Sequence, residues 1–354
     1  MTPALFTPIT LRDLTLPNRL WVAPMCQYSA VDGCVSTWHV MHHGAFASGG
    51  AGLIFAEATG VVPEGRISVG CPGMWSDATA ASWRPVVDFV HSLGGHIGIQ
   101  LSHAGRKGSR RLDWVGGHAE PEEGGWQIVG PSDNAYTGYP TARALTVAEI
   151  EALVGHFADA ARRAVAVGFD AIELHAAHGY LLHQFLSPLV NERTDEYGGS
   201  FDNRVRFPLA VIRAVRAAIP TGMPLIVRLS ATDWADGGWD LEQSIEFAKR
   251  MKEAGVDLVD VSTAGVVHEQ QVQVGPGYQV PFATAIREGA GIPVSAVGLI
   301  TEAEQANAIV EEGRADVVEV ARAALRNPRW PFVVAEQLGH RPDLPPQLNR
   351  ARRV

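Results

Sequence analysis

The chain of 354 residues has few cysteines, no excess of positive charge and no long hydrophobic segment. Its three cysteines include no CxxC pair, so we expect neither a disulfide framework nor an iron–sulfur cluster, and a reducing compartment is favoured. The formal net charge of −9 argues against a nucleic-acid-binding surface. The longest stretch without Asp, Glu, Lys or Arg, residues 33–56, contains histidines and an SGGAG break and predicts no membrane span.

The first residues, MTPALFTPITLRDL, also lack the basic start and apolar centre of a signal peptide. We therefore expect a soluble, cytoplasmic protein. With 46% hydrophobic residues, a chain of this length can bury a sizeable core.

Short aliphatic or β-branched runs recur along the whole chain and predict eight strands. Their near-continuous hydrophobicity is typical of parallel strands that are buried on both faces. The runs cover residues 19–25, 52–58, 96–101, 170–176, 224–230, 258–263, 292–298 and 316–322. Amphipathic patterns between them predict helices at 147–168, 204–219, 241–255 and 301–313. Thr146 and Glu149 have the spacing of a capping box at the start of the first of these helices.

Eight strands alternating with helices favour a single (β/α)8 barrel, an α/β TIM-barrel domain spanning residues 1–354. An open Rossmann sheet would place GxGxxG after the first strand, where the sequence reads APMCQYS instead. Long insertions at 102–145, 177–203 and 264–283 follow the C-terminal ends of strands, the face where barrels build their active sites. Residues 326–354 are predicted to form a C-terminal extension outside the barrel repeat.

Polar side chains stand at the C-terminal ends of several of these runs, where burial is unfavourable unless each polar group is satisfied. They are Cys26, Gln100, His175, Arg228 and Arg322. A shared ligand explains this ring better than five separate structural roles. Gly298 and Arg322 follow the last two strands, where barrels often bind phosphate. Flavin mononucleotide (FMN) suits these donors, because an amide and a guanidinium can bind its pyrimidine edge. Another phosphorylated ligand could use the same donors.

The segment ELHAAHGYLLHQF (173–185) places two histidines and a tyrosine where a predicted strand gives way to a loop. His175 and His178 could bind a metal, or hold a substrate oxygen while Tyr180 supplies a proton, or serve a structural role. The chain has no HExxH motif and no set of carboxylates beside these histidines, which disfavours the metal.

Four motifs together resemble the Old Yellow Enzyme family, in particular its branch of shorter bacterial enzymes typified by YqjM and xenobiotic reductase A. They are APMCQYSA (23–30), QLSHAGRKG (100–108), ELHAAHGYLLHQFLSP (173–188) and NERTDEYGGSFDNRVRF (191–207). The last of these is long and specific, and the likeness extends from ALFTP (4–8) to the C-terminal tail.

The resemblance implies an FMN-dependent ene-reductase in which NAD(P)H reduces the flavin. Flavin N5 then passes hydride to the β-carbon of an activated alkene such as an enone, a maleimide or a nitroalkene. By motif position, His175 and His178 would bind the oxygen that activates the alkene. Tyr180 would protonate the α-carbon, since an unperturbed phenol with a pKa of about 10 is protonated at neutral pH.

The resemblance also implies roles for residues around the flavin. Cys26 corresponds to a flavin-proximal cysteine, and Tyr28 to a tyrosine that hydrogen-bonds the substrate. The positions implied for FMN contact are Pro24, Met25, Cys26, Gly60, Gln100, His175, Arg228, Gly298, Ala321 and Arg322.

Three positions depart from the family pattern. Gly60 stands where relatives commonly carry Ala, which predicts slightly more room near the flavin, and Ala321 replaces a glycine before the phosphate-binding arginine. The tail segment QLNR (347–350) has Leu348 where the pattern has Tyr. This segment implies a homo-oligomer, a dimer or a tetramer, in which Arg350 reaches a neighbouring subunit's site.

Alternatives from other classes remain at the level of sequence. One is another FMN barrel reductase, acting on unsaturated thioesters, although the larger enzymes of that kind carry a cysteine cluster and further domains. A second is a metal-dependent barrel hydrolase that uses His175 and His178. A third is a flavin carrier without catalytic activity.

Overall fold

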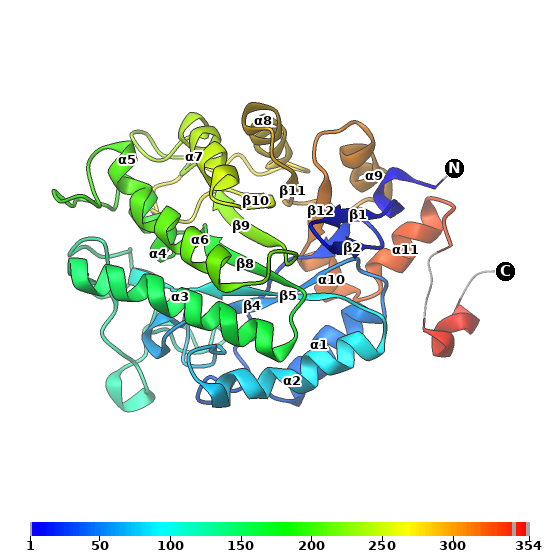
Figure 1. The fold of residues 1–354 in the computed structure, drawn as a ribbon, viewed down its shortest axis with the longest axis horizontal. Coiled ribbons are helices and arrows are strands. Elements are labelled where there is room, and N and C mark those ends of the chain that lie inside the picture. Colours follow the sequence, from blue (N-terminus) through cyan, green and yellow to red (C-terminus); the bar gives the residue numbers. More distant parts are fainter. Residues whose placement is uncertain (1, 342–344, 352–354) are drawn as a thin grey trace.

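The computed structural model describes residues 2–341 and 345–351 and contains a closed barrel of parallel strands surrounded by helices (Figure 1). Around the barrel the order is β3, β4, β5, β8, β9, β10, β11, β12, and β12 pairs with β3 to close it. Their bounds are β3 Leu20–Val22, β4 Ile54–Gly60, β5 Ile97–Ser102, β8 Ala171–Ala176, β9 Leu225–Ser230, β10 Leu258–Ser262, β11 Val294–Ala296 and β12 Val317–Val320. Each strand overlaps one of the predicted runs, so the predicted (β/α)8 barrel is confirmed.

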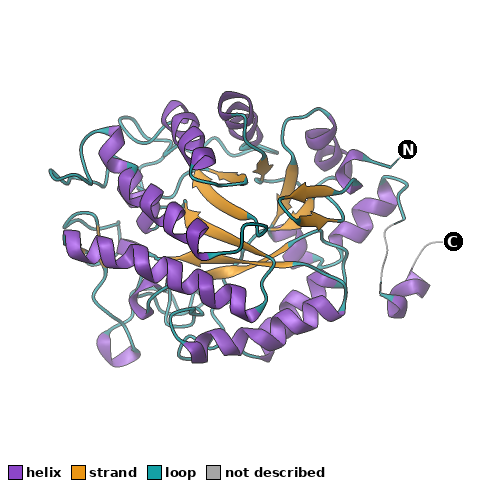
Figure 2. Ribbon diagram, in the orientation of Figure 1, coloured by secondary structure: helices purple, strands orange, loops and turns teal. Residues whose placement is uncertain are grey.

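Helices form the outer layer of the barrel (Figure 2). They are α1 Thr37–Ala47, α2 Asp77–Ser92, α3 Val147–Val167, α6 Arg206–Ala218, α7 Leu241–Glu253, α8 Val280–Ala290 and α9 Ala303–Glu311. The predicted capping box is present at α3, because the Thr146 hydroxyl accepts from the backbone N–H of Glu149 and the Glu149 carboxylate accepts from that of Thr146. Gly168 ends α3 with a φ of 106°, a conformation that glycine adopts without steric cost.

The helix predicted at 204–219 corresponds to α6, and a separate short helix that was not predicted comes before it. A short helix, α5 (Phe201–Arg204), ends one residue before α6 begins at Arg206. Pro208 explains the break, because a proline has no N–H to donate to the carbonyl of Arg204 four residues earlier. In the first turn of α6 the same proline is tolerated.

An apolar plug closes the N-terminal end of the barrel. The antiparallel hairpin of β1 (Ile9–Leu11) and β2 (Leu14–Leu16) packs in one hydrophobic cluster with residues from the starts of the barrel strands. Trp21 and Phe55, both buried, make an edge-to-face contact in this cluster. Because this end is filled with hydrocarbon, polar chemistry is confined to the opposite end.

The predicted insertions follow the C-terminal ends of β5, β8 and β10. The first contains η3 (Gly105–Lys107), η4 (Pro121–Glu123) and a pair of two-residue strands, β6 (Val129–Gly130) and β7 (Arg143–Ala144), and the second contains α4 (Leu181–Leu186) and α5. After β12 come α10 (Arg322–Arg326), α11 (Trp330–Gln337) and η5 (Pro346–Ala351), and Figure 1 shows η5 at the outer edge of the molecule. Within the described residues, no helix combines the length and apolarity that crossing a membrane requires.

Candidate active site

Strand register brings three of the predicted residues together at the C-terminal end of the barrel. His175 on β8 lies opposite Arg228 on β9, and Gln100 on β5 lies opposite Glu173 on β8. The side chains of Gln100, His175 and Arg228 are all buried. Three of the five residues of the predicted polar ring are therefore close together on these neighbouring strands.

His175, His178 and Tyr180 also converge. The ring of His175 lies 5.1 Å from that of His178 and 4.8 Å from that of Tyr180, measured between centroids, and both contacts are nearly perpendicular. His175 is the penultimate residue of β8, whereas His178 and Tyr180 lie on the turn that leads into α4. The two histidines and the phenol thus line one small region, as the sequence predicted.

The turn is held in a strained conformation by its neighbours. His178 has a φ of 57°, which costs a non-glycine residue about 1–3 kcal/mol. Its N–H donates to the Ser230 hydroxyl at 2.9 Å, and its carbonyl accepts from Lys107 Nζ at 2.8 Å. Lys107 also donates to the carbonyl of Gly265, so this lysine, which the sequence left without a role, fixes the backbone of the histidine turn.

A buried histidine–aspartate pair supports the same turn from below. His183 Nδ1 accepts from the N–H of Gly179 at 2.9 Å, and His183 Nε2 lies 2.8 Å from Asp233 Oδ1. Gly179 has no room for a side chain, since a Cβ there would lie 2.1 Å from the carbonyl oxygen of Gly265. Sequence reasoning missed His183 and Asp233, although His183 is the third histidine of the same motif.

Hydrogen bonds orient the rings of both histidines at the mouth of the barrel. His175 Nδ1 accepts from the N–H of Ala177, so the ring proton is on Nε2. His178 Nε2 lies 2.7 Å from Ser262 Oγ, which lies farther, at 3.3 Å, from the amide oxygen of Gln279. The short contact with Ser262 thereby fixes the orientation of the His178 ring. Within the described residues neither His175 Nε2 nor His178 Nδ1 has a hydrogen-bond partner.

Both histidines are neutral at pH 7. Burial lowers the pKa of His175 and of His178 well below the ordinary value, and the nearby guanidinium of Arg228 lowers both further. Each ring therefore presents a neutral N–H donor and no full charge.

Cys26, Tyr28 and Tyr180 pack around a small apolar cluster beside the histidines. A hydrogen bond with Cys71 and burial raise the pKa of the Cys26 thiol. Burial, followed by the proximity of Cys26, raises the pKa of Tyr28 and of Tyr180. All three groups keep their protons at neutral pH, and Cys71, which the sequence did not single out, is the partner of Cys26.

Charged groups lie directly beneath this layer. Arg228 Nε is 2.9 Å from Asp260 Oδ2, and Gln100 Nε2 donates to Glu173 Oε1 at 2.6 Å. These contacts use one nitrogen of each side chain, which leaves the guanidinium NH₂ groups of Arg228 and the amide oxygen of Gln100 without a partner in the described part of the chain. Such donors and acceptors fit the pyrimidine edge of a flavin.

A pocket of about 90 Å³ lies where the phosphate was predicted, and it is lined by residues 297–301 and 319–323 with Arg326. Gly298 has a φ of 116°, which requires glycine, and a Cβ there would lie 2.9 Å from Gln279 Nε2. Arg322 is exposed at its edge. Ala321 has a φ of −116°, so its methyl group introduces no backbone strain. The pocket and its arginine fit a phosphate group.

The other predicted residues are placed less directly. Pro24 and Met25 are half-buried just after β3, and Met25 packs against the main core. Gly60 ends β4, and a Cβ there would lie 3.0 Å from the carbonyl oxygen of Val62, so the room that a glycine leaves is toward the following loop. Arg350 is exposed in η5 and approaches none of the residues above within a hydrogen-bond or ion-pair distance.

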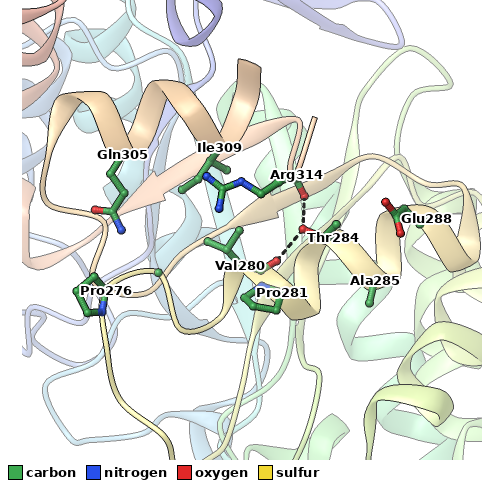
Figure 3. A pocket seen from close by; sticks show the side chains of 10 residues that line it. Pro276, Val280, Pro281, Thr284, Ala285, Glu288, Gln305, Ile309 and Arg314 are labelled. Atoms are coloured by element: carbon green, nitrogen blue, oxygen red, sulfur yellow. Dashed lines mark hydrogen bonds between the residues drawn. The ribbon is translucent and has the colours of Figure 1, made fainter. Parts of the chain in front are cut away.

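A second pocket, of about 570 Å³, lies outside the barrel between α8 and α9 (Figure 3). None of the predicted site residues lines it. The Thr284 hydroxyl, which Figure 3 shows at its wall, is already bonded to the carbonyls of Val280 and Arg314. This pocket is therefore separate from the chemistry at the barrel mouth.

Comparison with known proteins is consistent with this geometry. A model described as the NADH:flavin oxidoreductase / NADH oxidase family matches residues 4–341. The chain belongs to this family. The resemblance to Old Yellow Enzyme is thereby confirmed, and with it the oxidoreductase class, the FMN cofactor and the nicotinamide reductant. Family membership also decides against the metal-dependent hydrolase.

Individual relatives share most of the chain. An NADPH dehydrogenase of Geobacillus thermodenitrificans is 48% identical over 356 residues, which is 100% of both chains. The structure of an old yellow enzyme homologue from Zymomonas mobilis is 31% identical with a TM-score of 0.79, covering 97% of this chain and 95% of that one. A 2-naphthoyl-CoA reductase complex has a TM-score of 0.87 at 27% identity, covers 95% of this chain, and is matched over 53% of its own length.

In the described residues, two groups of side chains are close enough together to be compared with metal sites, and neither includes the histidine pair. One is Cys26, Glu57 and Cys71, and the other is Glu173, Asp260 and Glu319. His175 and His178 therefore stand without the carboxylate or thiolate partners that a metal site would need.

The phosphate pocket makes a testable distinction between FMN and riboflavin. Arg322→Ala should weaken FMN binding roughly 10- to 100-fold, because a charge-assisted hydrogen bond contributes about 1.5–3 kcal/mol. Riboflavin, which has no phosphate, should bind the variant and the wild type equally. Fluorescence titration of the apoprotein measures both affinities, and Arg314→Ala, at the outer pocket, is the matched control. Equal losses for both ligands would show that Arg322 acts on the fold instead.

Proposed function

We propose that this flavoprotein reduces the carbon–carbon double bond of activated alkenes, including enones, maleimides and nitroalkenes. The proposal rests mainly on one observation, the convergence of two neutral histidine N–H donors and a protonated phenol at the end of β8. This set suits an oxygen that gains negative charge while a neighbouring carbon gains a proton.

His175 and His178 bind the activating oxygen of the substrate through Nε2 and Nδ1, respectively. A hydrogen bond to an oxygen strengthens as the oxygen becomes anionic, so the pair stabilises the enolate-like transition state more than the substrate. Because both rings are neutral, they polarise the oxygen without trapping the anion in a permanent ion pair. Bound FMN supplies the hydride, from N5, that the β-carbon accepts.

Tyr180 donates the proton to the α-carbon. Its raised pKa keeps the phenol protonated throughout the neutral range, so the proton is available whenever a carbanion forms beside it. Tyr28, which packs against the same apolar cluster, adds a hydrogen bond to the substrate, and Cys26 contacts both flavin and substrate.

The remaining predicted residues position the cofactor. Gln100 and Arg228 bind the pyrimidine edge, and Gly298, Ala321 and Arg322 bind the phosphate. Pro24, Met25 and Gly60 contact the ring system through van der Waals surfaces. In Gly60 both backbone groups are already bonded, its N–H to the carbonyl of Pro72 and its carbonyl to the N–H of Met74.

An unsaturated thioester is the second candidate substrate. The high structural similarity to a 2-naphthoyl-CoA reductase complex favours it, because the same histidine pair can hold a thioester carbonyl. Rapid-mixing kinetics of the reduced protein with enones, maleimides, nitroalkenes and unsaturated thioesters separates the two. The class that reoxidises the flavin fastest at equal concentration is the substrate class.

We also propose that the protein is a cytoplasmic homo-oligomer, a dimer or a tetramer. The free thiols of Cys26, Cys34 and Cys71 support a reducing compartment. The exposed position of Arg350 at the end of η5 supports contact with a neighbouring subunit.

Removing the phenolic hydroxyl tests the proton donor. Tyr180→Phe should leave reduction of the flavin by NAD(P)H unchanged and slow the alkene half-reaction about 10²- to 10⁴-fold, the range for loss of a general acid. Stopped-flow absorbance measures each half-reaction separately, with Tyr139→Phe as the control. Wild-type rates in both half-reactions would exclude Tyr180 as the acid.

Phenols test the oxygen clamp, because a phenolate mimics the enolate. His175→Ala and His178→Ala should each weaken binding of p-hydroxybenzaldehyde by roughly 5- to 150-fold, equivalent to about 1–3 kcal/mol per buried hydrogen bond. The long-wavelength absorbance of the phenolate–flavin complex reports binding, and exposed His156→Ala should bind as wild type. Unchanged affinity in both histidine variants would contradict the clamp.

Contact between subunits can be tested through Arg350. In an oligomer with shared sites, Arg350→Ala should raise KM for the alkene several-fold while kcat stays within about twofold, since an arginine at the site entrance affects binding more than chemistry. Light scattering gives the oligomeric state, and Arg341→Ala is the control. A monomeric wild type, or an unchanged KM, would contradict the role of Arg350.

A further inference from the structure

Three carboxyl side chains meet inside the barrel, one layer beneath the candidate site. Glu173, Asp260 and Glu319 come from β8, β10 and β12, which are alternate strands, and alternate strands contribute to one layer of a barrel interior. All three are 0% exposed, and one oxygen of each lies within 4.8 Å of the others. We call these three residues the carboxyl cluster.

The cluster has too few partners for its oxygen atoms. Glu173 Oε1 accepts from Gln100, and Asp260 Oδ1 accepts from Ser295 Oγ at 2.8 Å. The other oxygen of Glu173 and both oxygens of Glu319 have no hydrogen-bond partner among the described residues. Buried polar atoms are nearly always hydrogen-bonded, so these three oxygen atoms require an explanation.

The cluster also has too little positive charge. Arg228 is the one cation that contacts it, with Nε 2.9 Å from Asp260 Oδ2 in the described part of the chain. Three ionised carboxylates beside one guanidinium would leave two buried negative charges uncompensated, which is strongly unfavourable. Each protonated carboxyl group removes one of these charges and donates its O–H to an unpartnered oxygen of a neighbour, so protonation reduces both deficits together.

The pKa shifts of the three carboxyl groups also favour protonation. Burial, with the charge of Asp260, raises the pKa of Glu173 to about 8. Burial, followed by Asp260 and Glu173, raises the pKa of Glu319 well above its ordinary value, and burial also raises that of Asp260. A metal ion is a poorer occupant than a proton, because it would lie beside the guanidinium of Arg228.

The cluster is close enough to the cofactor to respond to its charge. Glu173 and His175 stand two residues apart on β8, about 6.6 Å along the strand, and on the same face. Arg228 contacts the cluster through Asp260, and under the proposed function its free nitrogens face the flavin. Hydride transfer from NAD(P)H adds one negative charge to bound FMN. That negative charge offsets part of the positive potential that Arg228 exerts on the carboxylates. The affinity of the carboxylates for a proton therefore rises.

We propose that the carboxyl cluster holds shared protons at neutral pH and takes up a further proton from solvent when bound FMN is reduced. Glu319 is a positioning residue in this scheme, since it acts on the flavin through Arg228 and touches neither substrate nor cofactor. The balance is simple: FMN gains the hydride, NAD(P)H becomes NAD(P)⁺, and a cluster carboxylate becomes a carboxylic acid. This inference rests on the proposed placement of Arg228 beside FMN.

The pH dependence of the flavin midpoint potential tests the proposal. In the wild-type holoenzyme, potentiometric titration from about pH 6 to about pH 9 should show up to one additional proton per two electrons on the alkaline side, where a carboxylate is ionised before reduction. Glu319→Gln resembles the protonated acid and cannot ionise. Its potential should match the wild type near pH 6, become more positive than the wild type near pH 9, and vary less with pH.

The control is Glu304→Gln, which removes the same formal charge from the exposed surface of α9 and should reproduce the wild-type curve. Parallel curves for wild type and Glu319→Gln at every pH would overturn the proposal. Failure of the protein to bind FMN, or of NAD(P)H to reduce it, would instead refute the proposed function, so the two failures are distinguishable.

A second measurement needs neither flavin nor a redox step. The infrared spectrum of the wild-type apoprotein at neutral pH should contain the carbonyl band of buried protonated carboxyl groups, shifted in D₂O. The difference spectrum against Glu319→Gln should show loss of one such group. Absence of the band from wild type, or a stoichiometric metal ion that Glu319→Gln fails to retain, would overturn the proposal even if the variant cannot be reduced.

Discussion

The burial of a single guanidinium, Arg228, at the mouth of the barrel constrains the rest of the site. A buried cation must be paired, and Asp260 on the neighbouring strand provides the pair at 2.9 Å. Burial, followed by this same charge, lowers the pKa of His175 and of His178, so that both rings remain neutral. The guanidinium of Arg228 can also bind an anionic group of a ligand. Arg228 therefore influences both the carboxylate of Asp260 and the neutral histidines of the candidate site.

Under the proposed function, neutral donors matter because the site must release its reduced product. An imidazolium pair would bind an enolate-like anion strongly and would also give up its protons to it, competing with Tyr180. In the proposed mechanism, the two rings, held by Ala177 and Ser262, polarise the oxygen and leave proton delivery to the phenol. Lys107 and the His183–Asp233 pair contribute only by fixing the turn that carries these groups.

The fold could be predicted because buried parallel strands are hydrophobic on both faces. All eight runs, from 19–25 to 316–322, show this pattern. Helix α3 could also be placed, since Thr146, Glu149 and Gly168 mark both of its ends. The short helix α5, which precedes the helix predicted at 204–219, was missed because four residues are too few to show an amphipathic pattern. Residues of the site at strand ends, such as Gln100 and His175, were found because polar groups there interrupt hydrophobic runs.

The carboxyl cluster was missed for a related reason. Glu173, Asp260 and Glu319 are each a single acid inside an apolar strand, and a sequence does not show that alternate strands bring them together. The strand period nevertheless links them to the site, because His175 and Ser262 lie two residues beyond Glu173 and Asp260 on the same inward faces. Each of these strands thus carries an acid in the lower layer and a hydrogen-bonding group in the upper layer. The pleat of β8 and β10 therefore connects the carboxyl cluster to the hydrogen-bonding groups of the candidate site. A substitution along either strand must preserve this connection.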